Sequence, residues 1–136
     1  MFFLSLYWLI SPILWILLPV FAIFNTKIRH HWLHERSSWK EALVRIQEIG
    51  DRRKAVLFHA ASAGEFEQLQ PILKKVDRSR YFVLLTFFSP TVFLTEKETI
   101  LADAVCYHPF DFPWSAWFFF RKMEIQYYII TRNDIW

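Results

Sequence analysis

Charged side chains are absent from the first 24 positions of the chain: all 16 Lys and Arg residues and all 13 Asp and Glu residues come later. Residues 2–24, FFLSLYWLISPILWILLPVFAIF, form an apolar run long enough to cross a bilayer as one helix, which takes about 20 residues. No basic residue precedes this run, the run is long, and its end is a poor cleavage site. A retained anchor over residues 1–25 therefore fits better than a cleaved signal peptide.

Glycine and cysteine are also scarce, with two glycines and one cysteine in 136 residues. Two glycines leave no flexible linker, so we expect a single folded domain behind the anchor. The lone Cys106 excludes an internal disulfide, which agrees with a reducing compartment, and it is expected to pack in a strand. No internal repeat, low-complexity segment or nucleic-acid motif is present.

The basic residues nearest the anchor indicate its orientation and its partner. Lys27, Arg29 and Arg36 follow the apolar run, which by the positive-inside rule places the rest of the chain in the cytoplasm. With a net charge of only +3, these residues favour anionic lipid head groups over nucleic acid. An open alternative is a hairpin or in-plane helix, kinked at Pro12 or Pro19, that enters one leaflet.

Beyond the anchor, residues 26–53 are predicted to form an amphipathic juxtamembrane helical region and residues 54–136 a domain of alternating strands and helices. Ser38 and Glu41 predict a capping box at the start of one helix, with Gly50 as its stop signal. The alternation predicts an α/β, Rossmann-like parallel sheet with helices on both faces and ligands beyond the carboxyl ends of the strands. We expect strands at 55–59, 82–87, 104–107 and 126–131, and helices near 65–76, 90–98 and 113–123.

The segment KAVLFHAASAGE, residues 54–65, carries the strongest chemical signal. Its apolar strand breaks into small residues that allow a tight turn and close approach to a ligand, and a helix starts near Glu65. Free amide N–H groups and the helix dipole favour an ionised Glu65 there, and an exposed carboxylate at such a junction is a competent general base. The simpler alternative, that Glu65 only complements the helix dipole, stays open.

Histidines near the anchor suggest a second, weaker site. His30 and His34 are spaced like metal ligands on a helix, beside His31 and Glu35, but no third ligand is evident. A protonatable helix that meets lipid head groups is the favoured interpretation.

Two features of the last third of the chain also allow two interpretations. Asp111, in a loop held by prolines, is expected either to cap the next helix or to contact a ligand. The aromatic run at 114–120 is expected to pack on the sheet, with contact to lipid or acyl chains as the functional alternative.

The order of four motifs behind the apolar segment resembles a known family. HAASAGE (59–65), TFFSPT (86–91), YHPFDFP (107–113) and RNDIW (132–136) follow one another as in the N-terminal half of bacterial 3-deoxy-D-manno-octulosonic acid (Kdo) transferase. This resemblance covers essentially the whole chain. It implies a membrane-associated, inverting glycosyltransferase of GT-B architecture that transfers Kdo from the donor CMP-Kdo to a lipid A precursor, with no metal or other cofactor.

The resemblance also assigns roles to individual residues. It makes Glu65 the base that deprotonates the acceptor hydroxyl and places Arg132 where the family has a glutamate that stabilises the transition state. Acceptor-binding positions implied in the same way are His59, Ser62, Gly64, Ser89, Asp111 and Asp134.

Several departures from the family pattern limit the expected activity. Arg132 and Asp134 stand where the family has a Glu-x-Glu pair, and Val92 stands where it often has glycine. The donor-binding domain that should follow the last motif is not in these 136 residues, so we expect the chain alone not to transfer Kdo. A separately encoded donor half is one partner that would restore activity, and the expected location is the inner membrane. The alternative function is a non-catalytic, membrane-anchored module that binds lipid or protein.

Overall fold

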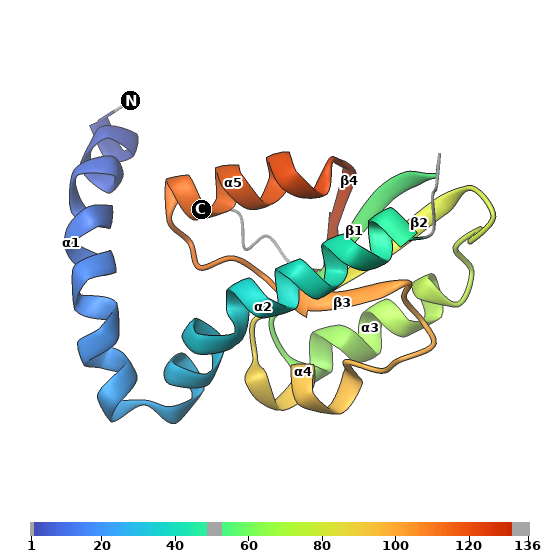
Figure 1. The fold of residues 1–136 in the computed structure, drawn as a ribbon, viewed down its shortest axis with the longest axis horizontal. Helices are drawn as coiled ribbons and strands as arrows, with labels where there is room; N and C mark the ends of the chain where they lie inside the picture. The colour runs from blue at the N-terminus through green and yellow to red at the C-terminus, as the bar shows by residue number, and fades with distance from the viewer. Residues whose placement is uncertain (1, 49–52, 132–136) are drawn as a thin grey trace.

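A parallel sheet lies between layers of helices in the computed structural model, which describes residues 2–48 and 53–131 (Figure 1). The predicted alternation of strands and helices is confirmed over residues 54–130, with ends that differ by at most three residues. The elements are α1 (Phe2–Phe24), α2 (Thr26–Glu48), β1 (Lys54–Ala60), α3 (Ala63–Leu73), β2 (Tyr81–Phe87), α4 (Pro90–Glu96), β3 (Ala104–Tyr107), α5 (Pro113–Met123) and β4 (Ile125–Ile130).

The four strands pair in the order β3-β2-β1-β4, and every pairing is parallel. The chain adds β2 and β3 on one side of β1 and then returns through α5 to place β4 on the other side. This change of direction makes the carboxyl ends of β1 and β4 the topological switch point, where open α/β sheets bind ligands. The predicted fold class is therefore confirmed.

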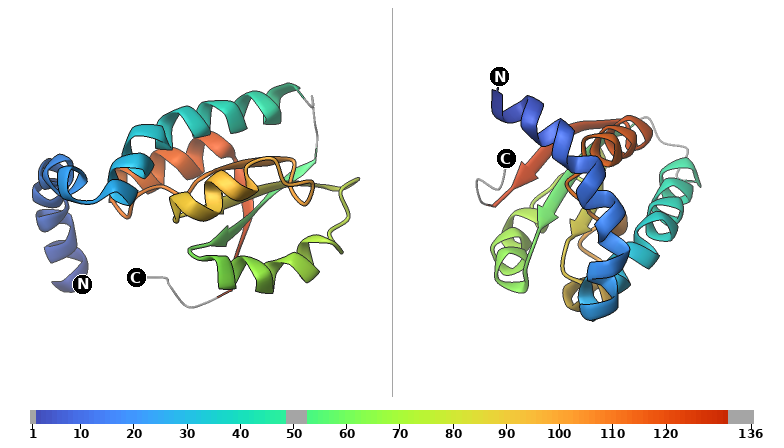
Figure 2. Two further views of the ribbon diagram at one scale, coloured as in Figure 1. Left: turned by 90° about the horizontal axis from the view of Figure 1, so that it is seen from below. Right: turned by 90° about the vertical axis from the view of Figure 1, so that its left-hand side faces the viewer.

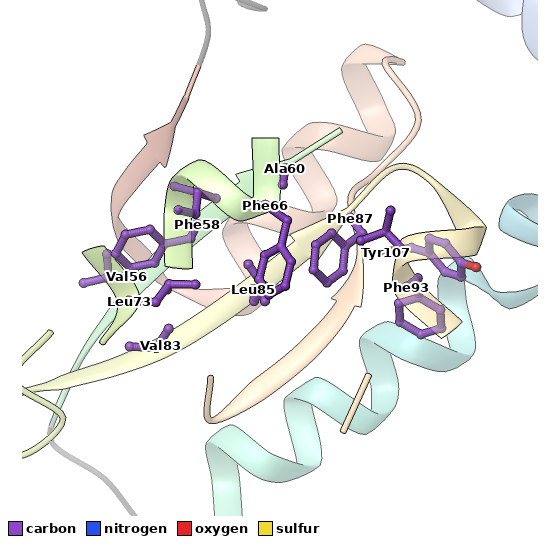
Figure 3. Close-up of a cluster of buried hydrophobic side chains, with 12 residues drawn as sticks. Val56, Phe58, Ala60, Phe66, Leu73, Val83, Leu85, Phe87, Phe93 and Tyr107 are labelled. Carbon is purple, nitrogen blue, oxygen red and sulfur yellow. The ribbon is translucent and has the colours of Figure 1, made fainter. Parts of the chain in front are cut away.

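Helices cover both faces of the sheet, with α3 on one side and α2 and α5 on the other (Figure 2). Successive strand residues point to opposite faces, and both sets are apolar because both faces are covered. The core under α3 is drawn in Figure 3 and includes Val56, Phe58, Phe66, Val83, Leu85 and Phe87. The core under α2 and α5 includes Trp39, Leu57, Leu84, Cys106, Phe119 and Met123.

The predicted capping box at Ser38 and Glu41 is wrong, because α2 already begins at Thr26 and runs through both residues. The side chain that starts α2 is Asn25, whose Oδ1 accepts hydrogen bonds from the amides of Lys27 (3.0 Å) and Ile28 (3.2 Å). Ser38 instead binds the edge strand β3: its hydroxyl accepts the amide N–H of Tyr107 at 3.1 Å. The stop signal proposed at Gly50 lies outside the described residues.

Helix α1 is continuous through both of its prolines. Its segment Ser5–Phe24 has a mean hydropathy of 2.1 and is long and apolar enough to cross a membrane. Ser11, Leu18 and Ala22 are buried, whereas Leu9, Ile16 and Ile23 lie on the opposite side and are exposed. The helix thus presents one side to the protein and a largely apolar side outward, on which Ser5 is the polar residue.

The aromatic run of α5 divides between the core and the surface. Phe119 is fully buried against the sheet, as expected for packing. Trp117 and Phe118 are 61% and 45% exposed, and the side chains of Arg121 and Lys122 lie over their rings. Exposed aromatic rings paired with cations are typical of surfaces at the edge of a bilayer.

Candidate active site at the carboxyl ends of the strands

A cavity of about 450 Å³ opens at the switch point between β1 and β4. Its walls come from the end of β1, the start of α3, the loops that follow β2 and β3, α5, and the end of β4. The polar side chains in these walls are the ones that would meet a bound ligand. The lining residues are His59, Ala61, Glu65, Phe88, His108, Pro109, Phe110, Asp111, Ala116, Phe120, Tyr128, Ile130 and Thr131.

Glu65 lies in this cavity wall, in the first turn of α3, as the sequence predicted. Its Oε2 accepts the backbone N–H of Ala61 at 2.7 Å, while its own N–H donates to Ser62 Oγ at 3.4 Å. This reciprocal arrangement is a variant of the capping box, in which the carboxylate reaches one residue further back than usual. In the part of the chain that the structure describes, no group donates to Oε1, so one carboxylate oxygen is held and the other stays available.

Ser62 and Gly64 occupy different positions in the turn that starts α3. Ser62 is the N-cap residue of α3, with extended backbone angles. Gly64 lies in the first turn, where an added Cβ would meet nothing within 4 Å. The fold itself therefore does not demand glycine at position 64, and neither Ser62 nor Gly64 is among the residues that line the cavity.

His59 and His108 are two polar residues that line the same cavity as Glu65. The His59 Nδ1 lies 3.1 Å from Thr86 Oγ1 on the neighbouring strand, and its ring centroid is 4.0 Å from that of His108. His108 in turn places Nε2 at 3.0 Å from the hydroxyl of Tyr128 on β4. These contacts join β1, β2 and β4 at the strand ends.

The electrostatic state of His108 follows from its surroundings. Burial, followed by the nearby His59 and His31, lowers its pKa to about 3, against an opposing effect of the Pro109 carbonyl. His108 is therefore a neutral hydrogen-bonding group at physiological pH. Sequence reasoning noticed this residue in its loop but did not assign it to the site, and it missed Tyr128, because their meeting depends on how the loop after β3 folds over β4.

Asp111 is part of the cavity wall and does not cap α5, whose N-cap position is Phe112. The hydroxyl of Tyr7 donates to the Asp111 carbonyl at 2.6 Å and lies 3.0 Å from Oδ1. This contact joins α1 to the rim of the cavity. Of the two interpretations that the sequence allowed, the structure excludes the cap.

The remaining predicted residues lie apart or cannot be placed. Ser89 is the N-cap residue of α4, makes no side-chain capping bond and is not among the cavity residues. Arg132 and Asp134 lie outside the described residues. Among residues 2–48 and 53–131, no cluster of three His, Cys, Asp or Glu side chains could hold a metal.

The helix was predicted to meet lipid head groups through its histidines, and for His31 this is wrong: its side chain is 1% exposed and lies against the loops that follow β2 and β3. His34, by contrast, is exposed, and His30 lies between these extremes, with Nδ1 at 2.9 Å from the hydroxyl of Tyr107. The three histidines near the anchor thus occupy three different environments, although they lie on one helix.

A comparison with known protein families matches residues 37–136 to the family described as 3-deoxy-D-manno-octulosonic-acid transferase (kdotransferase). The chain belongs to this family. The match corresponds to the N-terminal half of the transferase, as the order of motifs predicted. It makes the chain a glycosyltransferase-like domain, and the cavity at the switch point contains the glutamate of its HAASAGE motif. No curated protein and no solved structure matches the chain.

Proposed function

We propose that this chain is the acceptor-side half of a Kdo transferase, in which Glu65 removes the proton from the acceptor hydroxyl of a lipid A precursor. The observation that carries this proposal is the position of Glu65: it lies in the wall of the cavity at the switch point, with one oxygen fixed by the Ala61 N–H. A base held in this way loses little freedom when the substrate binds, which favours proton transfer.

The chemistry assigned to the cavity is simple. The acceptor hydroxyl approaches the Oε1 atom of Glu65, gives up its proton as the C–O bond to Kdo forms, and CMP leaves from the donor. His108 and Tyr128, which contact each other at 3.0 Å, offer neutral hydrogen-bonding groups to the acceptor sugar. The resemblance assigns donor binding to the other half of a GT-B enzyme, so CMP-Kdo needs only to present its anomeric carbon at the mouth of this cavity.

The place of action proposed for the domain is the cytoplasmic side of the inner membrane. Helix α1 supplies an apolar surface suited to lipid, and Lys27, Arg29 and Arg36 follow it at positions that are exposed. Anionic head groups and the phosphates of a lipid A precursor are natural partners for these cations. The acceptor would then remain in the membrane while its sugar enters the cavity.

The direct test is Kdo transfer by the intact chain in detergent micelles, combined with a supplied donor half of a Kdo transferase, CMP-Kdo and a lipid A precursor. Glu65→Gln should lower the rate by about 10²- to 10⁴-fold, the usual contribution of a general base. Glu67→Gln is the matched control, since Glu67 is an exposed carboxylate two positions further along α3. Equal rates for Glu65→Gln and the native chain would remove Glu65 from the base role.

The same assay separates the enzyme from a non-catalytic module. The sequence feature that favours a module is Arg132, which stands in place of a family glutamate. If the native chain binds the lipid A precursor but transfers no Kdo with the donor half, while Arg132→Glu does, the site is an impaired one. If neither transfers Kdo and the precursor still binds, the chain is a lipid-binding module.

A further inference from the structure

A buried pair of ionisable residues on α2 lies before the segment that matches the family. His31 and Glu35 are one helical turn apart, and both are buried, with exposures of 1% and 7%. The family match begins at residue 37. Buried ionisable side chains are rare unless they are paired and hydrogen-bonded, so the surroundings of this pair call for an explanation.

Both ring nitrogens of His31 face carbonyl oxygens. Nδ1 lies 2.9 Å from the carbonyl of Phe88, and Nε2 lies 2.9 Å from the carbonyl of His108. A carbonyl oxygen can only accept a hydrogen bond, and a neutral imidazole has a single N–H. The ring that fits both contacts is therefore the imidazolium, with a proton on each nitrogen.

Glu35 supplies the matching negative charge. Its Oε2 lies 3.4 Å from the Nε2 of His31 and accepts the backbone N–H of Phe110 at 3.0 Å, while Oε1 lies 3.5 Å from the hydroxyl of Ser115. The carboxylate thus contacts the His31 ring on α2, the loop after β3 and the first turn of α5. A buried ion pair is tolerated when its remaining hydrogen-bonding capacity is satisfied in this way.

The backbone groups that the pair holds belong to the cavity wall. Phe88, His108 and Phe110 all line the cavity that contains Glu65, and they come from the two loops that follow β2 and β3. We propose that His31 and Glu35 form a positioning ion pair that fixes both loops of the cavity to α2, and through α2 to the apolar helix α1. The cavity's role as acceptor site rests on the proposed function, whereas the pairing itself does not.

The groups around His31 are aromatic rings and few charges. The ring of Tyr107 on β3 stacks on it at 4.4 Å between centroids, and the rings of Phe88 and Phe110 lie at 4.7 Å and 4.3 Å. The titratable groups nearby are His30 and Glu35 on α2, Tyr107 on β3 and His108 in the following loop, and Glu35 is the carboxyl group among them. Three aromatic faces suit a cation and keep water away from it.

The first experiment measures the protonation of His31 without any enzyme assay. Nitrogen-15 NMR of the intact chain in detergent micelles at pH 7 should show two slowly exchanging ring N–H protons for one histidine, assigned to His31 by their loss in His31→Gln. A single ring N–H on His31 at pH 7 would overturn the ion pair. Because no substrate is involved, this result is independent of whether the chain transfers Kdo.

The second experiment tests the positioning of the loops. Glu35→Gln and His31→Gln should each shift the amide resonances of Phe88, His108 and Phe110, and each should lower the thermal midpoint by about 10 °C or more, because one buried partner is left uncompensated. The double variant should be less destabilised than the sum of the two single variants. His34→Gln, an exposed histidine on the same helix, should do neither.

A purely local role would give a different outcome. If single variants lower the midpoint additively and leave the three loop amides unshifted, the pair does not position the cavity and the proposal fails. If His31→Gln does not fold, correlations between the His31 ring and its own backbone in the native chain assign the ring N–H signals, and they decide the protonation of His31. Should the assay with a donor half give transfer, His31→Gln should raise KM for the lipid precursor more than it lowers kcat, since the pair touches no reacting atom.

Discussion

The two faces of the sheet differ in what they bury. The face under α3 is a cluster of apolar side chains in which the hydroxyl of Tyr107 is the polar group, whereas the face under α2 and α5 changes along its length. In the middle of the strands that second face holds Leu57 and Leu84, and toward the carboxyl ends it holds His59 and Thr86. Buried polarity in this fold thus gathers beside the cavity, which indicates that one face serves stability and the other also serves a site.

The largest expected effect is on the apolar face. Phe58 is 1% exposed in the cluster under α3, and Phe58→Ala should destabilise the chain by about 3–5 kcal/mol, because it removes transfer energy and leaves a cavity. Chemical denaturation followed by circular dichroism measures this change. A loss of less than about 1 kcal/mol would mean that the α3 face is not the main source of stability.

A pH effect should mark the polar face. The pKa of His108 is lowered to about 3 in the folded chain, whereas an unfolded histidine titrates near 6.5. Between these values the unfolded state binds more protons, so stability falls as pH falls from about 6.5 toward 3, by up to about 1.4 kcal/mol per pH unit.

Replacing this histidine removes the effect. His108→Gln should make the thermal midpoint depend less steeply on pH in the same window, and His34→Gln at an exposed position should leave the slope as it is. If the dependence of the thermal midpoint on pH is unchanged in His108→Gln, the lowered pKa of His108 is not the cause of the loss of stability at low pH.

A smaller effect is expected at the turn that holds Glu65. Ser62→Ala removes the side-chain cap of α3 and should cost about 1 kcal/mol. Because the cap and the Ala61–Glu65 bond share one turn, the rate of Kdo transfer should fall more than stability alone explains. Ser37→Ala is the control, since Ser37 is an exposed serine on α2 that does not line the cavity. Equal rates in the two variants would separate the cap from the site.

The smallest effect is expected at the contact between α1 and the cavity rim. Tyr7→Phe deletes the hydroxyl that binds Asp111 and should cost no more than about 1 kcal/mol, the net value of one exposed hydrogen bond. Urea denaturation in micelles measures this cost. A larger loss would mean that α1 is an integral part of the domain core.

Features that depend on residues close together in the sequence were predicted, and features that depend on distant residues were not. The strands and most helices were predictable because apolar periodicity is a local signal, and Glu65 was predictable because its turn and cap lie within five residues. Ser38 was misread because its true partner, Tyr107, is 69 residues away and a serine followed by a glutamate three positions later looks like a cap. Asn25 was a local signal that was overlooked behind the apolar run.

The polar side of the cavity was less accessible to prediction. His31 meets Phe88 and His108, which are 57 and 77 residues away, and Tyr128 meets His108 from another strand. His31 and Tyr128 belong to no periodic pattern or motif, and the YHPFDFP motif that contains His108 does not indicate its partners. Only the packing of two loops against α2 and β4 brings them together.

The bond between Tyr7 and Asp111 has a geometric consequence for the bilayer. Tyr7 lies 17 residues before the end of α1, so it is roughly 25 Å along the axis from the point where α2 departs. A polar loop that reaches this far along the helix cannot stay in water if the helix crosses the membrane. A helix that lies along a lipid surface keeps the bond between Tyr7 and Asp111, whereas a transmembrane orientation requires this bond to break.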